Sequence, residues 1–508
     1  MARITPGLAG IPDEVDVVVV GLGITGAGVA LDAVTRGLSV LAVDAHDLAF
    51  GTSRWSSKLV HGGLRYLAQG KLAIAQESAV ERGILMQVTA PHLVHALPML
   101  TPLNDAMPRS RTALTWGGLR AGDVLRRTAR TSTRILPRPR RLNATETLSL
   151  APSMRAETLR GGLLAWDGQL EDDARLVVTV ARTAASYGAE VRTRARVTSA
   201  TGTGVELRDE LTGETYAVRA RAVANATGVW AGDLDDQVRL RPSRGTHLVL
   251  RGSALPHTRV AVMVPIPGST SRFAMVLPQP DGTLYVGLTD EPVTGPIPDV
   301  PTPSEEEIDF LLGVVTSAFT VPPTRADVVG AFAGLRPLLG VEGTDESADL
   351  SRRHAILTSS TGVTTVVGGK LTTYRRMAED TVDALGLSTA PCRTAALPLL
   401  GAVGTSTAPT RLVRRFGSEA DLVLATAREV TGLPDDELLA AASDQVPVTL
   451  AELVFAITHE GAHDVDDLLD RRTRVGLVAE DRVVAQPLAE RAVGLARSVT
   501  HPTGKIPR

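Results

Sequence analysis

One stretch near the start of the chain, residues 16–44, constrains the fold more than any other. The apolar run Asp16–Val20 leads into the glycine-rich turn Gly21–Gly26, and an Ala/Val/Leu-rich segment follows the turn. A second apolar run then ends at Asp44. The order of strand, glycine turn, helix, strand and acid is the one that a dinucleotide-binding fold requires. The stretch therefore predicts a bound dinucleotide, although a glycine-rich turn in an ordinary α/β core would have a similar pattern.

Each residue type in this turn has a physical role. Gly21 permits the sharp turn, Gly23 lets the backbone approach a pyrophosphate at the helix N-terminus, and Gly26 lets helix and strand pack closely. A carboxylate after the second strand can accept hydrogen bonds from a ribose. The motif alone does not distinguish a nicotinamide from a flavin dinucleotide. The residues predicted to contact the cofactor here are Gly21, Gly23, Ile24, Thr25, Gly26 and Asp44.

A second stretch, Gly51–Leu67, is rich in small hydroxyl residues and glycine. It alternates these residues with Lys58, His61 and Arg65. Backbone N–H groups and hydroxyls in such a loop can reach phosphates and a ring system together. The alternative is a serine-capped helix whose charged residues are solvated.

Three later stretches also place glycine or a charge in an apolar setting. A predicted buried strand ends in Ala226-Thr227-Gly228, where backbone could press against a dinucleotide. Arg336 is surrounded by leucine and proline, so it faces either a ligand or a buried ion pair. Gly368-Gly369-Lys370 joins a strand to a helix, which is an anion-binding geometry.

Composition narrows the class of protein. The 508 residues allow two to four domains, and a net charge of −3 gives no drive towards nucleic acid. The single cysteine, Cys392, excludes an intramolecular disulfide and a cysteine-rich metal site, so a reducing cytoplasm is the expected setting. No metal site is predicted. We also expect no signal peptide and no membrane span, because no apolar run approaches about 20 residues.

The predicted secondary structure changes in character twice along the rest of the chain. Helical spacing over Asp172–Tyr187 is followed by short strands, and then strand patterns recur between Thr246 and Leu288 without intervening helices. Consecutive strands of this kind predict an antiparallel sheet. A helix is expected over Ser304–Phe319, with serine and acids at its start, and the region after residue 410 is helical in pattern.

A basic run occupies Arg120–Arg141, with eight arginines against one acid. Interleaved apolar residues would let it lie on anionic lipid as a basic amphipathic surface. The alternative is a solvated face, with Pro137 and Pro139 marking a loop.

Taken together, these motifs resemble those of FAD-dependent glycerol-3-phosphate dehydrogenases, the quinone-linked flavoenzymes. The resemblance runs in the family's order over nearly the whole chain, and its two longest motifs are Ser56–Leu67 and Gly368–Arg375. Leu22 replaces a glycine common in the family, and Arg54 and Trp55 are bulkier than usual. The other matching segments are Gly21–Gly28, Asp172–Leu176, Asn225–Trp230, Gly245–His247, Gly334–Leu338 and Arg471–Arg474.

The resemblance implies a mixed α/β fold. A discontinuous Rossmann-like FAD-binding domain would accompany a substrate domain on an antiparallel sheet and a C-terminal helical domain. The implied boundaries are 1–85, 150–240 and 340–388 for the FAD-binding domain, 86–149 and 241–339 for the substrate-binding domain, 389–410 for a linker and 411–508 for the helical domain.

The implied reaction oxidises sn-glycerol 3-phosphate to dihydroxyacetone phosphate. Hydride would pass from C2 to N5 of FAD, and a base must take the hydroxyl proton. His247 is the candidate base, Arg336 the candidate for phosphate and developing alkoxide, and Lys370 faces flavin or substrate. A satisfied strand histidine is the alternative for His247. The phosphate contacts are predicted to be Arg65, Arg336 and Arg352, with Arg353 as the register alternative to Arg352.

The further FAD contacts that the family pattern implies come from three segments. They are predicted to be Thr52, Ser53, Ser57, Lys58, His61, Gly62, Gly63, Ala226, Thr227, Gly228, Gly369, Lys370, Leu371 and Thr372.

The resemblance also implies a membrane quinone as acceptor and peripheral association with the inner face of the cell membrane. A homodimer is compatible with it, and no nucleic acid is involved. A glycerol-3-phosphate oxidase that uses oxygen, an amine or amino-acid oxidase, and a non-catalytic flavin-binding protein are the remaining alternatives.

Overall fold

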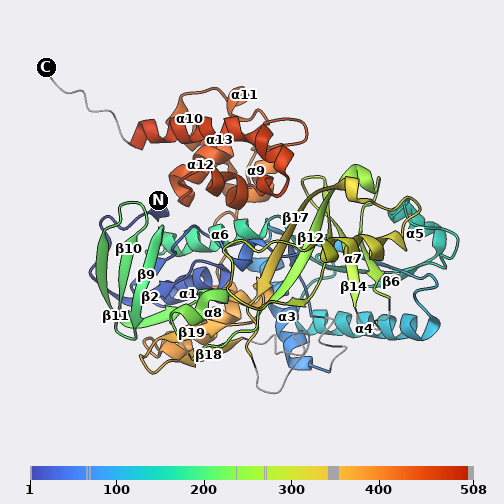
Figure 1. Cartoon of the computed structure of the whole chain (residues 1–508), viewed down its shortest axis with the longest axis horizontal. Coiled ribbons are helices and arrows are strands. Elements are labelled where there is room, and N and C mark those ends of the chain that lie inside the picture. The colour runs from blue at the N-terminus through green and yellow to red at the C-terminus, as the bar shows by residue number, and fades with distance from the viewer. Residues whose placement is uncertain are drawn as a thin grey trace.

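Two sheets lie side by side, and a helical domain packs against them (Figure 1). This arrangement comes from a computed structural model, which describes residues 3–63, 67, 70–235, 237–267, 269, 272–340 and 354–500. Predicted residues Arg65, Arg352 and Arg353 lie outside these ranges. The mixed α/β class and the C-terminal helical domain are both confirmed.

The first sheet carries the N-terminal motif at its centre. Its main path runs β1-β8-β3-β2-β11-β10-β9, and β19 extends it beside β11. Strands β2, β3, β8, β11 and β19 pair in parallel, whereas β9, β10 and β11 form an antiparallel meander. Its described strands are β1 (Thr5–Pro6), β2 (Glu14–Val20), β3 (Val40–Val43), β8 (Glu190–Thr193), β9 (Ala195–Thr201), β10 (Gly204–Asp209), β11 (Thr215–Asn225), β18 (Ala355–Thr358) and β19 (Thr364–Val367).

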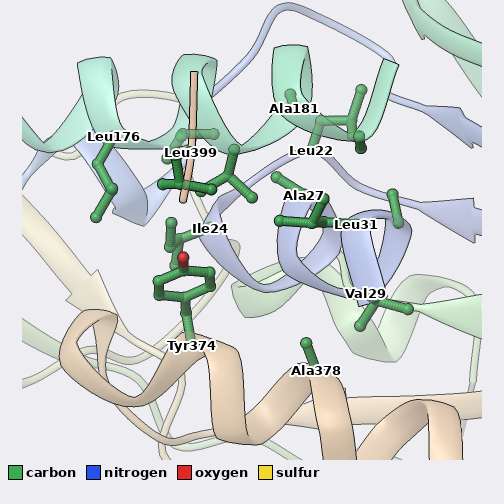
Figure 2. Packing of buried hydrophobic residues seen from close by; sticks show 14 of the residues in the cluster. Leu22, Ile24, Ala27, Val29, Leu31, Leu176, Ala181, Tyr374, Ala378 and Leu399 are labelled. Atoms are coloured by element: carbon green, nitrogen blue, oxygen red, sulfur yellow. The ribbon is translucent and has the colours of Figure 1, made fainter. Parts of the chain in front are cut away.

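Helix α1 (Ile24–Thr35) lies between α6 (Asp173–Ser186) and α8 (Tyr374–Leu385) (Figure 2). Its Ala- and Val-rich sequence is buried almost all round, so it forms the centre of the largest apolar core. Helix α6 begins at Asp172, whose carboxylate accepts hydrogen bonds from the N–H groups of Ala174 and Arg175. Packing against α6 and α8 fixes the position of α1 relative to the sheet.

The second sheet is mostly antiparallel, and β12 pairs with both β15 and β17. Helix α7 (Glu305–Thr316) packs on it, and Ser304 and Glu307 form its capping box, as the sequence predicts. The described strands of this sheet are β4 (Leu59–Val60), β5 (Val94–Pro102), β6 (Arg140–Leu142), β7 (Gly162–Leu170), β12 (Ser243–Arg251), β13 (Ala261–Pro265), β14 (Phe273–Pro278), β15 (Thr283–Gly287), β16 (Glu291–Pro292) and β17 (Val328–Arg336).

The C-terminal helices enclose a core of their own above α6 (Figure 1). Two ion pairs join them to the first sheet's layer: Arg175 binds Glu460 at 2.6 and 2.5 Å in a buried pair, and Arg182 binds the partly buried Glu419 at 2.6 and 3.1 Å. The remaining described helices are α3 (Leu72–Ile84), α4 (Arg109–Thr128), α5 (Ala144–Leu150), α9 (Thr410–Phe416), α10 (Ala420–Thr431), α11 (Asp435–Leu438), α12 (Leu450–Glu460) and α13 (Ala479–Thr500).

The structure adds detail to two segments. Most of the basic run lies in α4 and the segment that follows it, and its acid Asp123 is buried against Arg126 at 2.8 Å. The segment expected to be a linker contributes Leu397 and Leu399 to the core around α1. Among the described helices, none is long and apolar enough to cross a bilayer.

The tight start of α1 generates a stability prediction. A Cβ atom on Gly26 would lie 1.8 Å from the Gly21 carbonyl oxygen, so Gly26→Ala forces the helix away from β2. We expect this variant to lose about 3 kcal/mol or more of unfolding free energy, measured by thermal or denaturant unfolding. Gly313 in α7 has open space around its Cα, so Gly313→Ala is the control and should be neutral or stabilising by up to about 1 kcal/mol. Equal effects of the two substitutions would contradict this account.

Candidate active site

One large cavity lies where the two sheets meet. Its volume is about 1240 Å³, and residues of the glycine turn, β12, β17 and the β19–α8 connection line it. This exceeds the roughly 300–1,000 Å³ of a pocket for a drug-sized ligand, so it can hold a dinucleotide with a small substrate.

The glycine turn forms the wall at one end of the cavity. Gly21 has φ +96°, and a Cβ there would lie 2.7 Å from the Ala226 carbonyl oxygen. The Ile24 N–H, at the first turn of α1, donates a 2.9 Å hydrogen bond to Ser53 Oγ. Backbone N–H groups at a helix N-terminus are suited to a pyrophosphate, so this end of the cavity fits the phosphates of a dinucleotide.

Asp44 lies at the end of β3 and faces the same cavity. Its carboxylate accepts hydrogen bonds from the N–H groups of Leu22 at 2.7 Å and His46 at 2.9 Å. Burial raises the pKa of Asp44 to about 6, and the charge of Asp47 adds to that effect. An ionised carboxylate held in this way can accept hydrogen bonds from ribose hydroxyls.

Most of the predicted cofactor residues line the cavity. Thr52 Oγ1 donates to the Leu335 carbonyl at 2.7 Å, which ties this loop to β17. The predicted residues found in the cavity wall are Gly21, Gly23, Ile24, Thr25, Asp44, Thr52, Ser53, Ser57, His61, Ala226, Thr227, Gly228, Gly369, Lys370, Leu371 and Thr372.

Lys58 requires a correction, because its side chain is completely buried behind the wall. Its ammonium donates to Asp173 Oδ2 at 2.8 Å and to the Arg54 carbonyl at 2.5 Å. Gly62 and Gly63 do not line the cavity, and a Cβ on Gly62 would meet the Arg82 guanidinium at 2.3 Å. Gly26 packs against the turn, as its predicted packing role requires.

His247 faces the cavity from the middle of β12. Its Nε2 lies 2.8 Å from Ser57 Oγ, and its ring stacks on Phe332 with 4.8 Å between centroids. Burial lowers the pKa of His247 to about 3, and the charges of Lys58 and Arg336 contribute. The imidazole is therefore neutral at physiological pH, with a free lone pair but the strength of a weak base.

Arg336 is the last residue of β17 and lines the cavity. It lies four residues after Phe332, which pairs with His247 across the two strands. Its guanidinium donates at 3.1 Å to each of three oxygens: Ser243 Oγ, Asp290 Oδ1 and the Thr289 carbonyl. The side chain keeps 20% of its exposure, so it is an oriented cation at the cavity surface. An ion pair and a ligand contact are compatible here, because the fork has five N–H donors.

Lys370 is another cation in the cavity wall, which also contains Arg196 and Arg272. Its Nζ donates to Ser78 Oγ at 2.7 Å, and it follows Gly369, whose φ is +73°. A Cβ on Gly369 would lie 2.4 Å from Met377 Sδ, so glycine is required for the chain to reach this position.

Several cavity residues were missed from the sequence. Asp290 orients Arg336 and follows β15, but its position depends on the pairing of β16 with β12. Helix α4 contributes the face that contains Leu114 and Leu119. The sequence signal for Asp290 is an acidic residue shortly after a strand, in Thr289-Asp290. No sequence signal indicates that α4 lies beside the cavity.

FAD fits this site on three observations of the structure. The cavity is continuous from Asp44 to His247, the backbone at Gly21 and Gly23 approaches without side chains, and a helix N-terminus faces the space between. The donor set of backbone N–H groups and hydroxyls suits phosphates.

Family comparisons agree with this geometry. Residues 16–375 match the model described as FAD dependent oxidoreductase, and residues 392–498 match the C-terminal domain of alpha-glycerophosphate oxidase.

Individual relatives extend over nearly the whole chain. Glycerol-3-phosphate dehydrogenase 1 of Mycobacterium tuberculosis is 51% identical, over 98% of this chain and 97% of the relative. The mitochondrial glycerol-3-phosphate dehydrogenase of Arabidopsis thaliana is 33% identical, over 92% and 80%. Among solved structures, the Bacillus halodurans glycerol-3-phosphate dehydrogenase complexed with FAD aligns over 97% of both chains, with TM-score 0.71 and 28% identity.

The depressed pKa of His247 generates a prediction about acid stability. Between about pH 3 and its ordinary pKa near 6.5, the unfolded chain binds a proton at His247 that the folded chain does not. The contribution of His247 therefore makes stability rise with pH through this window and fall as the pH drops below 6.5. His247→Gln should reduce the loss in unfolding free energy between pH 6.5 and 5 by up to about 2 kcal/mol, measured by unfolding FAD-free protein. His257→Gln, at an exposed position, is the control and should leave the pH dependence of the unfolding free energy as it is in the wild type. The same pH dependence in His247→Gln as in the wild type would contradict the assignment.

Proposed function

The chain belongs to the family of FAD-dependent glycerol-3-phosphate dehydrogenases, and from that premise we propose that it oxidises sn-glycerol 3-phosphate to dihydroxyacetone phosphate. One observation carries the proposal: the neutral imidazole of His247 and the cations Arg336 and Lys370 line the same cavity as the dinucleotide-binding turn. The substrate needs a base at its C2 hydroxyl and cations at its phosphate, and this cavity offers both.

His247 is the proposed base. It takes the hydroxyl proton at Nε2 when the substrate hydroxyl replaces Ser57 Oγ as the hydrogen-bond partner of this nitrogen, and the Phe332 ring holds the imidazole plane. FAD held by the glycine turn and Asp44 would supply the redox chemistry, as an acceptor for the hydride of C2.

Arg336 and Lys370 are the proposed cations for the substrate phosphate. Arginine can engage phosphate oxygens in pairs, and Asp290 with Ser243 fixes the guanidinium plane before substrate arrives. Arg336 also stabilises negative charge that develops on the C2 oxygen. The proposed further phosphate contacts, Arg65 and Arg352, belong to stretches outside the described residues.

The proposed acceptor is a membrane quinone, reached from the inner face of the cell membrane by a peripherally bound enzyme. A glycerol-3-phosphate oxidase is the second candidate, because residues 392–498 match a domain named for alpha-glycerophosphate oxidase. Reoxidation rates with a quinone analogue and with oxygen separate the two: fast turnover with oxygen alone would favour the oxidase.

Anaerobic flavin reduction tests the substrate and the base together. Glycerol 3-phosphate should bleach the flavin absorbance of the purified protein, and glycerol should not. His247→Gln should retain the flavin but slow bleaching by about 10²- to 10⁴-fold, because the hydroxyl proton loses its acceptor. Dithionite should still bleach the variant at the normal rate. A wild-type flavin that glycerol 3-phosphate leaves oxidised would instead support a non-catalytic flavin-binding protein.

Arg336 is tested by its effect on substrate concentration dependence. Arg336→Met should raise the apparent KM for glycerol 3-phosphate by about 10- to 100-fold, as expected for losing a charge-assisted contact of about 1.5–3 kcal/mol. Arg325→Met, which breaks a surface pair with Glu305, is the control and should leave KM unchanged. If Arg336→Met lowers only the melting temperature, the ion pair with Asp290 is its whole role.

A further inference from the structure

The C-terminal helices contact the loop between β3 and the short helix η1 (Thr52–Arg54) through one buried carboxylate, Asp47. Asp47 Oδ2 accepts from Arg471 Nε at 2.7 Å and Arg472 Nη1 at 2.8 Å, and Oδ1 accepts from Arg472 Nη2 at 2.8 Å. Both arginines belong to the segment Asp467–Arg472, which follows α12. All three side chains are at most 5% exposed, so water does not weaken these bonds.

Asp47 lies inside the segment that forms the cofactor end of the cavity. Asp44, Ala45 and His46 precede it in the cavity wall, and the run from Phe50 to Ser53 follows it there. Asp44 is the predicted ribose acceptor, and Ser53 accepts from the N-terminus of α1. The arginines therefore bind the middle of the loop whose two ends face the cofactor.

Aromatic packing makes this loop sensitive to its anchor. The Phe50 ring stacks on His46 at 3.9 Å, and the Arg471 guanidinium lies 5.7 Å from the Phe50 centroid. Gly51 packs so closely on Trp230 that a Cβ would lie 2.7 Å from that ring. Because these side chains are tightly packed, a shift at Asp47 would also displace several cavity-lining residues.

Electrostatics gives the arginine pair a second role. Two carboxylates, Asp44 in the cavity wall and the buried Asp47, lie three residues apart, and the charge of Asp47 disfavours ionisation of Asp44. Arg471 and Arg472 neutralise Asp47, so the loop can keep both acids in place. Without the pair, an uncompensated buried charge would drive the loop to rearrange.

We propose that the C-terminal helical domain is a positioning element for the cofactor. Through Asp47, Arg471 and Arg472 hold residues 44–54 in the shape that accepts the ribose and pyrophosphate of FAD. The inference rests on FAD binding and is independent of the substrate that the enzyme oxidises.

The test measures FAD affinity of the full chain, without substrate. Arg472→Met should weaken FAD binding by about tenfold or more, followed through the change in flavin fluorescence on binding, because a small displacement of a positioned group costs this much. Arg182→Met is the matched control. It breaks a partly buried ion pair between α6 and the C-terminal domain, with Glu419, but neither residue belongs to or binds the cavity-lining loop 44–54. It should lower the melting temperature and leave FAD affinity within about twofold.

A second measurement uses the reciprocity of coupled equilibria. FAD should slow proteolysis of the C-terminal helices in the wild type and in Arg182→Met, but not in Arg472→Met. If Arg472→Met does not fold, Arg471→Lys replaces it in the test. This variant keeps the positive charge but loses the forked guanidinium, so it should also weaken FAD binding. Unchanged FAD affinity in folded Arg472→Met or Arg471→Lys would overturn the proposal. So would equal loss of affinity in Arg182→Met, because the effect would then be general destabilisation.

Discussion

The molecule depends on a backbone contact that only glycine allows. Helix α1 starts so close to β2 that Gly26 touches the carbonyl of Gly21, and Gly21 in turn touches the carbonyl of Ala226 at the end of β11. Three elements of the first sheet's layer therefore meet without side chains between them. The N-terminus of α1 is brought to the surface of the cavity by this contact, and the cofactor end of the site follows from it.

The second sheet supplies the chemistry through register. Pairing of β12 with β17 sets His247 opposite Phe332 and Ser243 opposite Arg336. The pairing of β12 with β15 brings Gly287 beside the imidazole, where a Cβ would lie 2.3 Å from His247 Cδ2. A slip of one residue would turn His247 away from the cavity and place its neighbour there. The base and the cation are thus fixed by a ladder of hydrogen bonds, which makes their separation insensitive to loop motion.

Local sequence patterns predicted the structural features that depend only on residues close together in the chain. The strand–glycine–helix order, the cap at Ser304 and the strand that carries His247 can each be read within a short window of sequence, and the structure contains all three. Lys58 could not be placed in this way, because its partner Asp173 is 115 residues away and starts a helix on another layer. Asp47 is likewise paired with arginines 424 and 425 residues later. Charges look alike in sequence whether they face a ligand or a buried partner, and only the tertiary structure separates the two.

The cations around His247 link substrate binding to catalysis on the proposed function. Burial is the main cause of the low pKa of His247, near 3, and the positive charges of Lys58 and Arg336 add to it, which keeps the imidazole neutral but makes it a weak base. A phosphate dianion at Arg336 would offset part of that positive field. The pKa of His247 would then rise towards the range in which proton transfer from a hydroxyl is most efficient. The substrate would in this way activate its own base, and a substrate without the phosphate would meet a poorer one in addition to losing its contacts. Recognition of the phosphate and removal of the proton would therefore be coupled through charge, although the two groups act at opposite ends of a small molecule.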